Sequence, residues 1–97
     1  MTKRVLYSKR IHENGAIEER VIWSVPRSPR HPEGIKYRLA FVKKPKERPL
    51  VLYDNHHPKG HHKHIRNKEM PYDFTNVEQL LKDFEKDIKE VLSHENT

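Results

Sequence analysis

Apolar and polar side chains alternate along the stretch Ile35-Lys36-Tyr37-Arg38-Leu39-Ala40-Phe41-Val42-Lys43. Successive side chains of a β-strand point to opposite faces of a sheet. Ile35, Tyr37, Leu39 and Phe41 would therefore share one face, and Lys36, Arg38, Ala40 and Val42 the other. The pattern predicts a strand of an antiparallel sheet whose apolar face is covered and whose other face meets solvent.

Four further segments have the composition of strands. Residues 4–11 and 16–25 flank Asn14-Gly15, a dipeptide that supplies the positive φ angles of a tight hairpin turn. Trp23 is predicted to face the core, like Tyr37. Residues 50–53 form a nearly continuous apolar run, and residues 61–65 are a candidate for a further short strand. Residues 26–34 contain three prolines and are predicted to form a loop.

The C-terminal segment predicts an amphipathic helix over about residues 75–93. Thr75 and Glu78 have the spacing of a capping box at its start. A stripe of apolar residues follows at helical spacing: Val77, Leu80, Leu81, Phe84, Ile88, Val91 and Leu92. The predicted fold class is therefore α+β, an antiparallel sheet of four or five strands with one C-terminal helix packed on one face. Residues 1–97 are predicted to form a single domain.

The composition describes a small, polar chain with a thin core. Hydrophobic residues make up 33% of the 97 residues, and the mean hydropathy is -1.07. A homodimer interface or a bound partner would compensate for so thin a core. The absence of cysteine excludes disulfides and thiolate metal sites. With no apolar run as long as a membrane span, a cytoplasmic protein is expected.

Positive charge is concentrated in the first three quarters of the chain. Residues 1–72 carry a net charge of +10 and residues 73–97 one of −4, which gives +6 overall. Such a distribution favours a polyanionic partner, either RNA or DNA. The candidate nucleic-acid contacts are Lys36, Arg38, Lys59 and Arg66. A lysine-rich surface that is merely solvated would show the same charge.

Histidines cluster in the His-rich segment, residues 54–66. Five of the eight histidines lie within nine residues: His56, His57, His61, His62 and His64. A core this thin could not satisfy five imidazoles, so packing alone does not explain the cluster. Three interpretations remain open.

The first interpretation is acid–base chemistry on a phosphodiester. His62 and His64 share one face of a strand, and Lys63 lies on the other. Two imidazoles can act in turn as base and acid, while Asp54 orients one of them and cations such as Lys63 and Arg66 neutralise the phosphate. Cleavage of RNA through its own 2′-hydroxyl needs neither metal nor cysteine.

The other two interpretations are a metal site and a solvated polar turn. The spacing of the histidines matches no established metal motif, so neither a metal ligand nor a cofactor is predicted. In the third interpretation the segment only contacts an acidic partner. The corresponding alternative function is a non-catalytic module that binds nucleic acid or another protein.

The run Leu52-Tyr53-Asp54-Asn55-His56-His57, followed by His61-His62-Lys63-His64, resembles the signature of the TumE-like toxins of prokaryotic toxin–antitoxin modules. The resemblance implies a growth-inhibiting toxin, a helix-turn-helix antitoxin as its partner, and kinship with compact ribonuclease toxins. The positions that match are Tyr53, Asp54, Asn55, His57, His62, Lys63 and His64. The resemblance adds His57 to the candidate catalytic residues Asp54, His62, Lys63 and His64. The short loop Pro58-Lys59-Gly60 departs from the family pattern.

Overall fold

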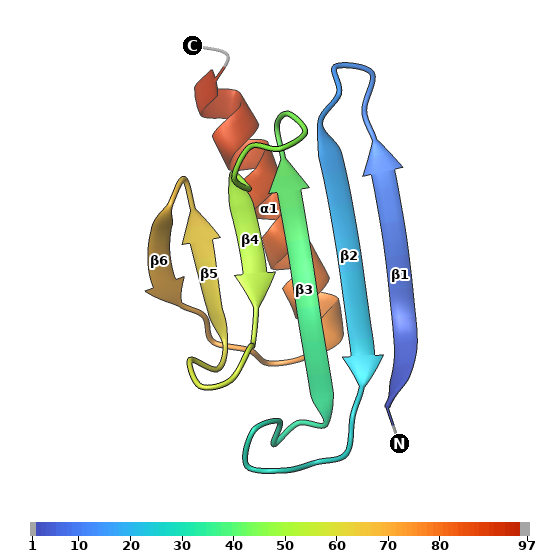
Figure 1. Ribbon diagram of the computed structural model, residues 1–97. Helices are drawn as coiled ribbons and strands as arrows, with labels where there is room; N and C mark the ends of the chain where they lie inside the picture. The colour runs from blue at the N-terminus through green and yellow to red at the C-terminus, as the bar shows by residue number, and fades with distance from the viewer. Residues whose placement is uncertain (1, 96–97) are drawn as a thin grey trace.

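The computed structural model describes residues 2–95, which form one antiparallel sheet and one helix (Figure 1). The strands are β1 (Lys3–Ile11), β2 (Ile17–Ser24), β3 (Ile35–Val42), β4 (Val51–Asp54), β5 (His62–Ile65) and β6 (Lys68–Pro71), and the helix is α1 (Val77–Glu95). The spatial order of the strands is their order in the sequence. The sheet is therefore a meander, and α1 crosses behind it in the view of Figure 1.

The prediction of an antiparallel sheet with a C-terminal helix is confirmed, but the described residues form six strands rather than four or five. The strand that sequence analysis missed is β6, whose residues Lys68-Glu69-Met70-Pro71 show no apolar alternation. Arg66 and Asn67 join it to β5 with φ angles of 50° and 72°. Two positive φ angles are typical of a two-residue hairpin turn. Asparagine, aspartate or glycine is the usual first residue of such a turn, so the arginine at this position did not indicate one.

The core lies between α1 and the face of the sheet that carries the apolar side chains of β3 and β4, as the alternation of β3 predicts. Tyr37, Leu39 and Phe41 are 2%, 0% and 0% exposed, and they pack with Phe84 and Leu80 of the helix. Burying one side chain of this size contributes about 1.5–3 kcal/mol. The apolar face of the sheet is therefore covered by α1.

Trp23 does not face this core, so that prediction is wrong. In the β2–β3 register Ile22 pairs with Tyr37, while Trp23 pairs with Lys36. Ile22 is fully buried, and Trp23 lies on the other face with the ammonium of Lys36 5.7 Å from its ring centre. A shift of one residue exchanges the two faces of a strand, and β2 has apolar residues on both.

The start of α1 also differs by one residue from the capping box. The side-chain oxygen of Asn76 accepts a hydrogen bond of 2.8 Å from the backbone N–H of Gln79. Asn76 is therefore the N-cap residue, in place of Thr75. The predicted stripe is confirmed, because Leu80, Phe84, Ile88 and Val91 are buried.

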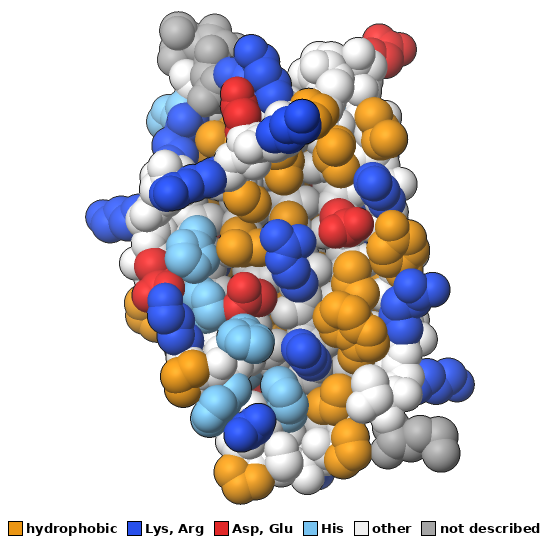
Figure 2. Space-filling model, viewed as in Figure 1, with side chains coloured by type: hydrophobic (Ala, Val, Ile, Leu, Met, Phe, Trp, Pro, Cys, Tyr) orange, Lys and Arg blue, Asp and Glu red, His pale blue; other side chains and the backbone are white. Residues whose placement is uncertain are grey.

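The face of the sheet turned away from α1, here called the open face, is visible in Figure 2. By register it carries Tyr7, Ile17, Val21, Trp23, Lys36, Arg38, Asp54, His62 and His64. Histidines gather toward its β4–β6 side and hydrophobic side chains toward β1 and β2 (Figure 2). No helix among the described residues has the length and apolar character needed to cross a bilayer.

Candidate functional site

Neighbouring strands bring the candidate residues together at the β4–β6 end of the open face. Asp54, the last residue of β4, pairs with His62, the first residue of β5. His64 lies two residues further along the same face and pairs with Glu69 of β6. Arg38 of β3 pairs with Asp54 from the other side. The meander thus places charged groups that are distant in the sequence in two adjacent rows across the sheet, Arg38-Asp54-His62 and His64-Glu69.

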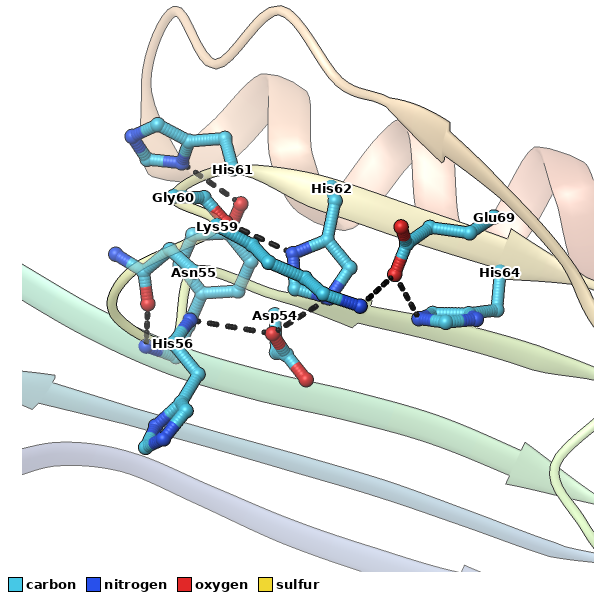
Figure 3. Close-up of polar contacts among 10 residues, drawn as sticks. Asp54, Asn55, His56, Lys59, Gly60, His61, His62, His64 and Glu69 are labelled. Atoms are coloured by element: carbon cyan, nitrogen blue, oxygen red, sulfur yellow. Dashed lines mark hydrogen bonds and ion pairs between the residues drawn. The ribbon is translucent and has the colours of Figure 1, made fainter.

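His62 is the most restrained of these side chains. Its Nε2 lies 3.1 Å from Oδ1 of Asp54, and its Nδ1 lies 2.8 Å from the carbonyl oxygen of Gly60 (Figure 3). The residue is 7% exposed. An oxygen acceptor therefore lies beside each ring nitrogen of His62. These two contacts fix the orientation of the imidazole.

His64 stands beside His62 on the open face. The two ring centres are 5.2 Å apart, and the ring planes are inclined by 73°. Nε2 of His64 is 3.4 Å from Oε1 of Glu69. One phosphodiester group could contact both imidazoles at this separation.

Glu69 is a member of the cluster that sequence analysis did not identify. Its Oε1 also accepts a hydrogen bond of 2.5 Å from the ammonium of Lys59 (Figure 3). This bond is the main cause that lowers the pKa of Glu69 below the ordinary value of 4.5. Only the β5–β6 register places Glu69 opposite His64, and β6 was not predicted.

Two shallow pockets adjoin the histidine pair. The first, of about 240 Å³, is lined by Asp54, His56, His57, Pro58, Lys59 and His62. The second, of about 330 Å³, is lined by Arg48, Pro49, Leu52, His64 and Asn67. His57 is exposed at the wall of the first pocket. The pair therefore lies between two hollows, each of which contains a cationic side chain.

Lys63 and Tyr53 lie on the opposite face of the sheet, against α1. The ammonium of Lys63 is 2.9 Å from Oδ2 of Asp87, and the hydroxyl of Tyr53 donates to the same carboxylate. Burial, reinforced by that hydrogen bond, raises the pKa of Tyr53 far above 10.0. The structure thus separates Lys63 from Asp54, His62 and His64, with which the resemblance had grouped it.

Three further residues of the His-rich segment also contact structural partners. The guanidinium of Arg66 donates to the carbonyl oxygen of Val91 in α1 at 3.2 Å. Asn55 is buried, and its amide group bonds the backbone of Tyr37 and Ile35. His61 turns away from the cluster, stacks on Phe74 at 4.7 Å and contacts the hydroxyl of Tyr37.

One group of side chains among the described residues could hold a metal ion. It consists of His62, His64 and Glu69, each of which offers a ligand atom within 4.8 Å of the other two. The arrangement therefore allows two kinds of chemistry, proton transfer by the imidazoles and coordination of a cation.

The comparison with protein families identifies the class of protein as a toxin. A family model described as Toxin TumE matches residues 2–92 of the 97-residue chain. The chain belongs to the TumE toxin family, which confirms the resemblance drawn from its Tyr-Asp-Asn and His-Lys-His runs. A toxin of this kind implies a cognate antitoxin as its partner. No curated protein and no solved structure matches the chain.

Proposed function

We propose that the protein is a ribonuclease toxin that cleaves RNA without a metal ion, and that Asp54, His62 and His64 perform the chemistry. The observation that carries the proposal is the contact of 3.1 Å between His62 and Asp54, beside a second imidazole on an uncovered sheet face. Titratable groups gathered in this way are typical of active sites. Membership of a toxin family supplies a reason for a small protein to carry such a site.

The proposed reaction uses the 2′-hydroxyl of the RNA as the nucleophile. His64 takes the proton of that hydroxyl, and the oxygen attacks the adjacent phosphorus. The bond from phosphorus to the 5′-oxygen then breaks, and the Nε2 proton of His62 leaves Oδ1 of Asp54 and passes to the departing oxygen. The products are a 2′,3′-cyclic phosphate and a 5′-hydroxyl end. Two positioned groups of this kind each contribute roughly 10²- to 10⁴-fold in rate.

Cations on the open face would bind the phosphates. Arg38 lies beside Asp54 in the register, and Lys36 follows on the same face. Lys59 is 59% exposed at the edge of the first pocket. In this proposal Lys63 and Arg66, which contact α1, hold the helix against the sheet instead of binding phosphate. His57 is proposed to contact the substrate from the pocket wall.

A growth assay tests the proposal in cells. Expression of the chain without its antitoxin, which we propose to be a helix-turn-helix protein, should stop growth and fragment cellular RNA. The His62→Ala/His64→Ala double variant, expressed to the same level, should do neither. Growth arrest by both proteins with intact RNA would reject the proposal in favour of a non-catalytic module that binds nucleic acid or protein.

A further inference from the structure

We propose that His62, His64 and Glu69 form a binding site for one Zn²⁺ ion, and that the bound ion inhibits the proposed cleavage of RNA. The binding half of this inference stands on the geometry of the three side chains. The inhibitory half rests on the proposed function.

One of the distances among the donor atoms already suits a tetrahedral ion. All three ligand atoms lie within 4.8 Å of one another. Nε2 of His64 and Oε1 of Glu69 are 3.4 Å apart. Two ligands of a tetrahedral Zn²⁺ ion with bonds of about 2.1 Å are separated by roughly the same 3.4 Å. This pair could therefore accept the ion with almost no movement.

His62 is already oriented as a metal ligand. The carbonyl oxygen of Gly60, 2.8 Å away, can only accept a hydrogen bond, so Nδ1 of His62 carries the proton. The lone pair of neutral His62 is then on Nε2. A backbone carbonyl that fixes the tautomer in this way is a common partner of metal-bound histidine. Asp54, whose Oδ1 is 3.1 Å from Nε2, lies where it can supply the fourth ligand.

The donor set selects the class of ion. Two imidazoles with one or two carboxylates suit Zn²⁺, whereas Mg²⁺ and Ca²⁺ prefer sites made wholly of oxygen. Two carboxylates also balance the charge of a divalent ion. The ammonium of Lys59, 2.5 Å from Oε1 of Glu69, competes with the ion for that oxygen. Lys59 is 59% exposed and can move into solvent when the ion binds.

Inhibition follows because the ion and the reactive proton need the same atom. In the proposed reaction Nε2 of His62 carries the proton that the leaving oxygen receives. An ion bound to Nε2 displaces that proton, and coordination of His64 removes the base as well. The metal-bound and the reactive states are therefore mutually exclusive.

Binding is measured first, without RNA. The untagged chain is titrated with Zn²⁺ against a chromophoric chelator and, separately, with Co²⁺, whose visible absorption is intense in a tetrahedral site. We expect one equivalent to bind, with a Kd at least tenfold weaker in Glu69→Gln and His64→Ala. His56→Ala, which removes an exposed histidine of the same segment outside the triad, should bind like the wild type. Lys59→Gln should bind roughly two- to fivefold more tightly, because it removes the competing charge.

Wild-type affinity in both Glu69→Gln and His64→Ala would overturn the site and leave an adventitious ion only. Glu69 is exposed, so its isosteric glutamine variant should fold, and circular dichroism checks this. Inhibition is measured next as cleavage of RNA with one equivalent of Zn²⁺. The wild type should lose activity and regain it with EDTA, whereas the rate of Glu69→Gln with the ion should equal the rate that the same variant shows in EDTA. Equal inhibition of both proteins would overturn the inhibitory half. Absence of cleavage even in EDTA would instead reject the proposed function, and the titration alone would then decide the site.

Discussion

Oδ1 of Asp54 lies 3.1 Å from Nε2 of His62, across the ladder that joins the last residue of β4 to the first residue of β5. The same oxygen accepts a hydrogen bond of 3.1 Å from the backbone N–H of His56, so the carboxylate also shapes the loop that follows. Asp54 therefore fixes both the imidazole and the wall of the adjoining pocket.

Asp54→Asn tests the orienting role of this carboxylate. Asparagine keeps an oxygen acceptor for the backbone N–H of His56 but removes the negative charge beside Nε2 of His62. We expect cleavage of RNA to fall by roughly 10²- to 10⁴-fold, with the melting temperature almost unchanged. Single-turnover rates on a labelled oligonucleotide measure the effect. A rate within threefold of the wild type would remove Asp54 from the mechanism.

Arg38→Ala tests whether RNA lies along the open face. Loss of one phosphate contact should weaken binding of a 2′-O-methyl RNA, which cannot be cleaved, at every sequence. The slope of log K against log salt should become shallower by roughly 0.7. Fluorescence anisotropy at several salt concentrations gives both values. Lys82→Ala on α1, far from this face, is the matched control, and an equal effect of the two variants would place the RNA elsewhere.

Lys63→Met separates a structural lysine from a catalytic one. The change leaves Asp87 without its ammonium partner and should lower the free energy of unfolding by about 1–3 kcal/mol. Cleavage at a temperature where the variant is folded should be retained. Denaturant titration and a cleavage assay on the same sample measure the two quantities. Normal stability with lost cleavage would return Lys63 to the catalytic group.

Three tyrosines in the core or packed against it predict how the fold responds to alkali. Burial is the largest cause that raises the pKa values of Tyr37, Tyr53 and Tyr72 above 10.0, with Asp87 and Asp83 adding to it for the latter two. A raised pKa in the folded state contributes stability that is complete below 10.0 and is lost as the pH rises above it. Ultraviolet titration should show these phenols ionising together with unfolding. Their ionisation in a chain that still shows native circular dichroism would contradict this.

How far the sequence predicts this protein depends on the residue in question. The alternation of residues 35–43 was enough for β3 and for the buried role of Tyr37, because period-two patterning reports burial directly. It failed for Trp23, because β2 carries apolar residues on both faces and only pairing with β3 decides between them. A one-residue change of register reverses every side chain, and local sequence does not contain that information.

The same limit applies to the candidate site. Asp54, His62 and His64 could be chosen from the sequence, because histidines two residues apart on a strand share a face. Glu69 could not, since its place depends on a two-residue turn at Arg66-Asn67 and on a strand without apolar alternation. The side chains of the family's Tyr-Asp-Asn run also lie on different faces of the sheet, because Asp54 faces the histidine cluster and Tyr53 faces α1. An RNA substrate, the homodimer and the helix-turn-helix antitoxin stay predictions.

The most direct test is the product of cleavage in the absence of metal. The purified chain is incubated in EDTA with a labelled RNA and with a DNA of the same sequence, beside His64→Ala and the His62→Ala/His64→Ala double variant. We predict that the wild type alone cuts the RNA, leaves 2′,3′-cyclic phosphate ends and spares the DNA. Intact RNA in every sample, or equal cleavage by the folded variants, would contradict cleavage of RNA by His62 and His64 without a metal.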